Sequence, residues 1–218
     1  ALGFSRARGV AVVDPQTPRD ELERLHRAGI CGIRLNLVAA GAGASETRER
    51  LMRAGDLAAS MGWHVQIFCE LARTATLGEE LAACAAPIVI DHFGRADARL
   101  GTEQPGFDLL LSLLRSGRAW IKLSAPYLVS DADGHDDVAP LVRALVAANP
   151  RQLLWGSDWP HPGGGFGVPA PDGIAPFRAV DDGAALDRLA QWLGDAGLLE
   201  DVLVDNPARL YGFDQSGS

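Results

Sequence analysis

The amino-acid sequence predicts an α/β fold of the TIM type, a (β/α)8 barrel, and three observations lead to this prediction. Short runs of β-forming residues alternate with helical patterns along the 218 residues, which indicates parallel strands joined by right-handed crossovers. Several predicted strands alternate polar with apolar residues, and their polar residues gather near the carboxyl ends. The last strand ends on an acid followed by a Pro-rich loop, at the sheet edge where parallel α/β folds keep their chemistry.

Six segments are predicted to be strands from their aliphatic and β-branched residues. They are Gly9–Val13, Gly32–Asn36, His64–Phe68, Ile88–His92, Ala119–Ser124 and Leu153–Asp158. Two helices are predicted from Thr17–Pro18 to Gly29 and from Ser45 to Gly62, between residues that typically start and end helices. Further helical patterns cover Leu77–Ala85, Gly106–Ser116, Asp137–Ala148, Ala184–Ala196 and Leu199–Leu210, the last interrupted at Pro207.

The strand patterns favour a barrel over an open sheet. Alternation places Arg34 and Asn36 on one face of their strand, Lys122 and Ser124 on one face of theirs, and Gln66 opposite aliphatic neighbours. An open doubly wound sheet is covered by helices on both faces, and its strands read as continuous aliphatic runs. In a barrel the inward face can be polar, because it lines a site at the carboxyl ends of the strands.

The strand count is two short of a complete barrel. We therefore expect about two further strand–helix units upstream of Ala1, on the order of 60–80 residues. Residues 1–218 are interpreted as a single barrel domain that is incomplete at its N-terminal side. The Gly/Pro-rich stretch Pro162–Pro176 is predicted to be a long loop within this domain, because it directly follows the acid-bearing strand.

Composition and charge restrict the classes of partner. The net charge is −8 without a Lys/Arg run, which argues against nucleic acid or an anionic membrane surface. No apolar run approaches the ~20 residues of a membrane span. Cys31, Cys69 and Cys84 are far apart and lack metal-site spacing, which indicates reduced thiols in a cytoplasmic protein. The expected partner is a small-molecule substrate.

The stretch 153–162, LLWGSDWPHP, contains the first candidate catalytic residue. Asp158 ends the strand and enters the loop, so we predict that it is a catalytic base at the mouth of the barrel. The alternative is that Asp158 only caps the turn before Pro160. Trp159 and His161 follow closely and are candidates to line the site, although His161 is equally well explained as a loop residue.

His92 is the second candidate catalytic residue. Alternation places it on one face with Ile88 and Ile90, and it places Asp158 at the end of a similar face. A His and an Asp from neighbouring strand ends are a plausible proton-transfer pair, or ligands if a metal is bound. The alternative for His92 is a hydrogen bond to a neighbouring loop. Asp91 falls on the opposite face and is predicted to be structural.

Inward-facing charges suggest how a substrate is held. Arg34 cannot stay unpaired in a core, so it either pairs with a buried acid or binds an anionic substrate, and we favour the second reading. Lys122 is open to the same two readings. Glu70 is a lesser candidate without a recognisable partner, whereas His64 is predicted to lie at the opposite, stabilising end of the barrel. The full set of predicted substrate-binding residues is Arg34, Asn36, Gln66, Arg95, Lys122, Ser124, Tyr127 and His161.

The segments RGVAVVD, GIRLN, VIDHFGR, WIKLSAPY, WGSDWPHP and DNPARLYGF together resemble the amidohydrolase superfamily. They are most similar to the amidohydrolase-2 group, which contains 2-pyrone-4,6-dicarboxylate hydrolases and sugar-lactone hydrolases. The resemblance implies a distorted (β/α)8 barrel and hydrolysis of a lactone. It also implies that Asp158 takes a proton from water, that His92 polarises the carbonyl or assists the leaving oxygen, and that Arg34 holds a substrate carboxylate.

Two departures from the family pattern matter. The His-x-His pair of the first strand is absent, which agrees with the expected upstream units. Many members bind zinc through that pair, a later His and the final Asp, whereas the pyrone-dicarboxylate branch works without metal. Metal use, through His92 and Asp158 if at all, is therefore left open. Leu128 stands where dicarboxylate-cleaving relatives carry an arginine, which favours a less charged lactone.

Glycine-rich phosphate motifs and a GxSxG nucleophile elbow are missing from the sequence, which disfavours P-loop, dinucleotide-dependent and standard serine-hydrolase functions. Two alternatives to a lactone hydrolase stay open. One is a zinc-dependent decarboxylase of the same superfamily, and the other is a non-catalytic barrel remnant.

Overall fold

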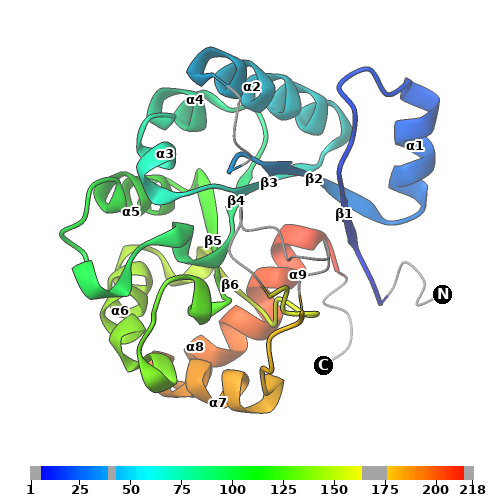
Figure 1. Ribbon diagram of the computed structural model, residues 1–218. Helices are drawn as coiled ribbons and strands as arrows, with labels where there is room; N and C mark the ends of the chain where they lie inside the picture. The colour runs from blue at the N-terminus through cyan, green and yellow to red at the C-terminus, as the bar shows by residue number, and fades with distance from the viewer. Residues whose placement is uncertain (1–5, 39–42, 164–175, 214–218) are drawn as a thin grey trace.

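The computed structural model describes residues 6–38, 43–163 and 176–213, so most of the predicted loop Pro162–Pro176 lies outside the described residues. Six parallel strands form one sheet in the order of the sequence, as Figure 1 shows. This confirms the predicted strands. Their bounds are β1 (Gly9–Ala11), β2 (Ile30–Asn36), β3 (His64–Phe68), β4 (Ile88–Ile90), β5 (Ala119–Ser124) and β6 (Leu153–Gly156).

The helices follow the strands in the predicted alternation, and α3 is an additional short helix. They are α1 (Arg19–Arg27), α2 (Ala44–Met61), α3 (Leu71–Ala75), α4 (Gly78–Ala83), α5 (Phe107–Arg115), α6 (Ala139–Ala148), α7 (Asp182–Leu193), α8 (Ala196–Glu200) and α9 (Asn206–Tyr211). The helix predicted over 199–210 is split, because a π-helical turn at Asp201–Asp205 separates α8 from α9. Pro207 lies in the first turn of α9, where its missing N–H costs no hydrogen bond.

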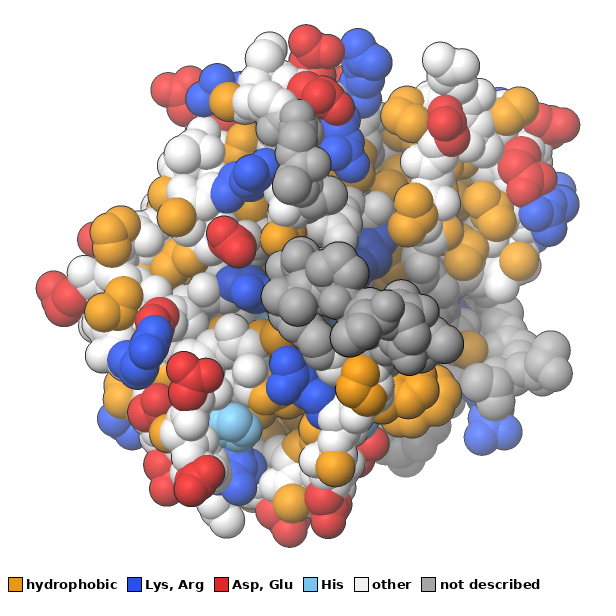
Figure 2. All heavy atoms as spheres, in the orientation of Figure 1, with side chains coloured by type: hydrophobic (Ala, Val, Ile, Leu, Met, Phe, Trp, Pro, Cys, Tyr) orange, Lys and Arg blue, Asp and Glu red, His pale blue; other side chains and the backbone are white. Residues whose placement is uncertain are grey.

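The sheet is curved into a half-barrel, and α2, α4, α5 and α6 lie along its outer side in Figure 1. Strands β1 and β6 form its two edges within the described residues. The two upstream strand–helix units stay a prediction. Acidic and basic side chains are interspersed over the outer helices on the face shown in Figure 2. Among the described residues, no helix is both long enough and apolar enough to span a bilayer.

The residues aligned between neighbouring strands show which side chains share a face of the sheet: the outer face is apolar and the inner face is partly polar. Arg34, Gln66 and Val89 are aligned on neighbouring strands, and Val89 is aligned with Trp120. Val89 and Trp120 pack with Leu154 in a small inner cluster against the end of α9. The opposite faces of the strands belong to the large core between the sheet and the helices. The predicted inward positions of Arg34, Gln66 and Lys122 therefore agree with the structure.

The prediction for the fourth strand is wrong in its choice of face. Ile88 and Ile90 are buried in the outer core, and Val89 faces inward, so Asp91 and not His92 continues the inward face of β4. His92 still reaches the interior because the chain leaves the extended conformation there, with φ of 54° at both His92 and Phe93. Two successive left-handed residues re-aim a side chain that strand alternation would point outward.

His64 lies buried at the amino end of the inner face, as predicted, where its ring meets Tyr211 edge-on with centroids 5.5 Å apart. Its Nε2 atom has no hydrogen-bond partner among the described residues. Burial, with a contribution from the Lys122 charge, lowers the pKa of His64 to about 4. The folded protein therefore holds this imidazole neutral at a pH where an unfolded chain, with a histidine pKa of about 6.5, is protonated.

This difference predicts a pH-dependent loss of stability. Because the unfolded state binds the extra proton, His64 should cost about 2 kcal/mol of unfolding free energy as the pH falls from about 7 to about 5. His64→Phe keeps a ring against Tyr211 and removes the titration. Urea unfolding at both pH values should show a smaller acid-induced loss in the variant by about that amount. An equal loss in both proteins would contradict the assignment.

Candidate active site

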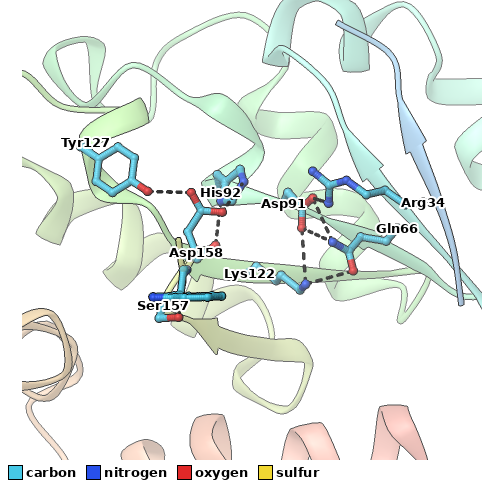
Figure 3. A network of polar contacts seen from close by, with 10 residues as sticks. Arg34, Gln66, Asp91, His92, Lys122, Tyr127, Ser157 and Asp158 are labelled. Carbon is cyan, nitrogen blue, oxygen red and sulfur yellow. Dashed lines mark hydrogen bonds and ion pairs between the residues drawn. The ribbon is translucent and has the colours of Figure 1, made fainter. Parts of the chain in front are cut away.

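Four side chains that follow β4, β5 and β6 form the first polar network of the site, and Figure 3 labels three of them, His92, Tyr127 and Asp158. His92 Nδ1 lies 2.8 Å from Ser124 Oγ, and His92 Nε2 lies 3.7 Å from Asp158 Oδ1. The Tyr127 hydroxyl donates a 2.6 Å hydrogen bond to Asp158 Oδ2. The structure thus brings together the two predicted catalytic residues and two of the predicted binding residues.

Local backbone geometry aims Asp158 into this network. Asp158 adopts a left-handed conformation with φ of 64°, which Asp tolerates better than most residues. The turn that follows closes through a 2.8 Å hydrogen bond from His161 N to Asp158 O. Ser157 Oγ, and not the Asp158 carboxylate, accepts the Trp159 backbone N–H at 3.1 Å. The turn-capping alternative for Asp158 is therefore not what the structure shows.

The protonation states of this network suit proton transfer. Burial lowers the pKa of His92, while the Asp91 and Asp158 carboxylates oppose that effect, so the ring is neutral near pH 7. Burial and the hydrogen bond to Asp158 raise the pKa of Tyr127, so its hydroxyl stays protonated and can only donate to the carboxylate. The Asp158 side chain is 22% exposed against 7% for His92, so the carboxylate is open to solvent and the ring is not.

A second network lies beside the first and is built around Asp91, whose side chain is 1% exposed (Figure 3). Arg34 Nη1 lies 2.5 Å from Asp91 Oδ2, and Gln66 Nε2 donates to both Asp91 oxygens at 2.9 and 3.1 Å. Lys122 Nζ donates to Gln66 Oε1 at 3.0 Å and lies 3.6 Å from Asp91 Oδ1. Burial lowers the pKa of Lys122, and the Asp91 charge opposes this effect.

This network bears on the predictions for Arg34, Lys122 and Asp91. Both cations pair with a buried acid, as the first of the two sequence readings expected, and their contact with a substrate stays a prediction. The outward face predicted for Asp91 is wrong, because its carboxylate is the centre of the inward network, whereas the structural role expected for it agrees with these contacts. A signal for it was present in the sequence, since two inward cations require a counter-charge. Arg34 keeps a 35% exposed side chain and can still face a ligand.

The remaining predicted site residues lie in different environments. The Arg95 guanidinium lies over the Phe68 ring, 5.3 Å from its centroid, and has no ion-pair partner among the described residues. Asn36 is exposed, and its Oδ1 accepts the Val38 backbone N–H at 3.0 Å, which gives it a local turn role. His161 is buried with Nε2 3.3 Å from Asp182 Oδ1, and it contacts Tyr127 edge-on. Trp159 is 76% exposed.

Arg178 is a neighbour of the site that the sequence did not indicate. Its guanidinium lies 4.8 Å from the centroid of the Tyr127 ring. It follows the long loop, so neither periodicity nor a motif connects it with β5. Only the folded chain shows that these two residues meet.

The side chains near the site show whether a metal ion has enough ligands there. Within the ranges that the structure describes, no group of three or more His, Cys, Asp or Glu side chains is arranged to hold a metal ion. His92 and Asp158 would supply two of the ligands in the superfamily pattern. These two donors alone do not make a zinc site, so no chemical step is assigned to a metal here.

A family model described as amidohydrolase matches residues 5–213. The chain therefore belongs to the amidohydrolase family. A 2-pyrone-4,6-dicarboxylate hydrolase from Comamonas testosteroni is 34% identical over 216 residues, covering 94% of this chain and 67% of the relative. A 4-sulfomuconolactone hydrolase from Rhizobium radiobacter is 35% identical over 194 residues, covering 88% of this chain and 62% of the relative.

A solved structure is also similar to this amidohydrolase. It is a candidate 2-pyrone-4,6-dicarboxylic acid hydrolase from Acinetobacter baumannii with citric acid bound. The TM-score is 0.75 at 28% identity, and the match covers 95% of this chain and 74% of that one. Family membership and the barrel-type fold are thus confirmed, and the named relatives support lactone chemistry. The amidohydrolase spans about two thirds of the length of these curated relatives.

Proposed function

We propose that this amidohydrolase hydrolyses a lactone with water activated by Asp158. The observation that carries the proposal is the meeting of Asp158 and His92 at the carboxyl ends of the strands, with Oδ1 and Nε2 3.7 Å apart. Asp158 is partly exposed and accepts the water proton while the water oxygen attacks the lactone carbonyl carbon. The ring C–O bond then breaks, and the proton held by Asp158 passes to the leaving oxygen, giving a hydroxy acid.

His92 and Tyr127 prepare the carboxylate and the carbonyl for this step. If the Ser124 hydroxyl donates to His92 Nδ1, the opposite Nε2 carries the hydrogen and can donate to the carbonyl or leaving oxygen. Tyr127 occupies Oδ2 of Asp158, which leaves Oδ1 as the oxygen that faces His92 and can accept the water proton. Each of the two carboxylate oxygens then has its own task.

The charges at the site favour a substrate that carries a carboxylate. Arg34 and Lys122 face the single negative charge of Asp91, so this network holds a surplus positive charge. Arg95 adds a cation that no described acid neutralises. The relatives named above act on a pyrone dicarboxylate and a sulfomuconolactone, which are both anionic. Leu128 in place of an arginine favours a substrate with fewer negative groups.

The function is tested by measuring ring opening in a pH-stat over a panel of carboxylated, sugar-derived and uncharged lactones. We expect turnover of at least one carboxylated lactone, with conversion to one equivalent of hydroxy acid. Absence of turnover over the whole panel, with the protein folded, would overturn the proposal. We also propose that the protein works in the cytoplasm, an assignment supported by three free cysteines, two of them buried.

Arg95→Met tests the carboxylate contact. The variant keeps an unbranched apolar side chain and loses the guanidinium that lies over the Phe68 ring. A charge-assisted hydrogen bond contributes about 1.5–3 kcal/mol, so KM for the carboxylated lactone should rise about 10- to 100-fold with little change in kcat. An uncharged lactone should show no such rise. Arg99→Met is the matched control, because Arg99 is exposed and paired with Asp97. Equal KM values in wild type and Arg95→Met would show that Arg95 does not bind the substrate carboxylate.

A further inference from the structure

A cavity of about 300 Å³ lies behind Tyr127, between the carboxyl ends of β5 and β6 and helix α7. Leu123 and Trp155 line it from the outer face of the sheet, where the two strands align them as neighbours. Neither His92 nor Asp158 lines this cavity. It is thus a separate cavity from the proposed catalytic centre, although Ser124 and Tyr127 of the first polar network border both.

Three buried polar atoms of the cavity-lining residues lack a hydrogen-bond partner among the described residues. They are Trp192 Nε1, Arg178 Nε and His135 Nδ1. The indole and the guanidinium can only donate hydrogen bonds, and the imidazole can do so in one tautomer. Buried polar atoms in folded proteins are almost always paired with protein, water or a ligand. Three of them on one cavity therefore indicate a molecule that offers acceptor atoms.

The charges around the cavity favour an anion. Arg178 lies over Tyr127 and has no ion-pair partner among the described acids. Arg188 also lines the cavity, and its only described partner is the 90% exposed Asp136 at 3.5 Å. Asp181 borders the cavity, but its Oδ1 accepts the Ala184 N–H at the start of α7. Two cations thus face two carboxylates, of which Asp136 is almost fully exposed and Asp181 already accepts a backbone hydrogen bond.

We propose that this cavity is a second binding site, distinct from the catalytic one, for a small carboxylate with an apolar body. The carboxylate would accept hydrogen bonds from Trp192, Arg178 and Arg188, and the apolar body would pack between Leu123 and Trp155. The volume lies at the lower end of the range for small-molecule pockets, which suits a single ring.

Benzoate is a suitable probe, and the indole N–H signals in ¹⁵N-labelled protein give a direct readout. Trp192→Phe identifies the Trp192 signal by its loss. Benzoate should shift this signal in a saturable way and leave the Trp63 signal unmoved, because Trp63 Nε1 is bound to His26 Nδ1 at 3.0 Å. Benzyl alcohol, an uncharged ligand of the same shape, should bind at least tenfold more weakly. Arg178→Met and Arg188→Met should each weaken benzoate binding about tenfold or more, and Arg99→Met should not.

Several results would overturn the proposal. One is no shift of the Trp192 signal up to saturating benzoate, and another is an equal response to benzyl alcohol. A third is binding that Arg95→Met abolishes and Arg188→Met leaves unchanged, which would place benzoate at the catalytic centre. An unaltered Trp63 signal in each ligand-free variant shows that it is folded, because Trp63 contacts His26 and does not line the cavity. The titration needs no turnover, so its outcome is independent of the proposed lactone hydrolysis.

Discussion

Asp158→Asn is expected to lower kcat for the best carboxylated lactone by about 10³-fold, because the amide has the shape of the carboxylate but cannot accept the water proton. General acid–base catalysis by one side chain contributes about 10²- to 10⁴-fold, which sets the size of the effect. The amide oxygen can still accept the Tyr127 hydrogen bond, so the position of the side chain should be kept. KM should change little. Steady-state kinetics with purified variants checks the expectation.

Asp182→Asn is the matched control for this variant. Asp182, the first residue of α7, is another carboxylate beside a histidine, 3.3 Å from His161 Nε2, but it contacts neither His92 nor Asp158 in the described structure. We expect its kcat to stay within about threefold of wild type, since surface substitutions away from the reacting atoms have small effects. If Asp158→Asn also retained a tenth or more of the wild-type kcat, Asp158 would not be the base.

Asp91→Asn is expected to lower the free energy of unfolding by about 3–5 kcal/mol. The substitution leaves Arg34 and Lys122, whose side chains are 35% and 19% exposed, without the fully buried carboxylate that faces both, and breaking a buried ion pair at one partner costs about that much. Most of this loss in unfolding free energy is the penalty of a cation left without its counter-charge. It is therefore much larger than the net stabilisation that the intact ion pairs give compared with an apolar core. Urea unfolding at neutral pH measures it.

Two comparisons make the Asp91 result specific. Asp97→Asn removes the acid of an exposed pair with Arg99, whose side chain is 67% exposed, and should cost at most about 1 kcal/mol. Adding Lys122→Met to Asp91→Asn removes one of the stranded cations and should restore part of the lost stability. A loss in Asp91→Asn no greater than in Asp97→Asn would show that the buried network is not needed for stability.

The two polar networks lie side by side because each is built on one of two consecutive residues, Asp91 and His92. Asp91 and His92 are consecutive, yet they serve different neighbours, because Asp91 continues the inward face of β4 and His92 turns inward through its left-handed backbone. The charge network therefore lies directly beside the proton-transfer pair. The charge network places positive charge next to the neutral His92 imidazole. This arrangement suits an anionic substrate whose carbonyl is attacked by water.

Much of the architecture followed from local patterns. β3 and β5 have the bounds predicted from alternation, and the polar residues Arg34, Gln66 and Lys122 lie on the inner face as expected. These features are readable because strand alternation has a fixed period of two, and because polar residues on one face of an otherwise aliphatic strand are costly unless they line a site. That Asp158 and His92 lie near each other was predictable for a different reason, since both follow parallel strands whose ends share one edge of the sheet, although alternation assigned His92 to the wrong face.

The sequence by itself determined the alternating α/β order, the polar inner face and the two residues proposed to move the proton. Tertiary structure alone decided that Asp91 neutralises Arg34 and Lys122, that His92 turns inward, and that Arg178 lies over Tyr127. The physical reason is that periodicity ends where a strand ends. Beyond that point, side-chain direction depends on individual φ angles and on contacts between distant segments, which no local pattern in the chain encodes.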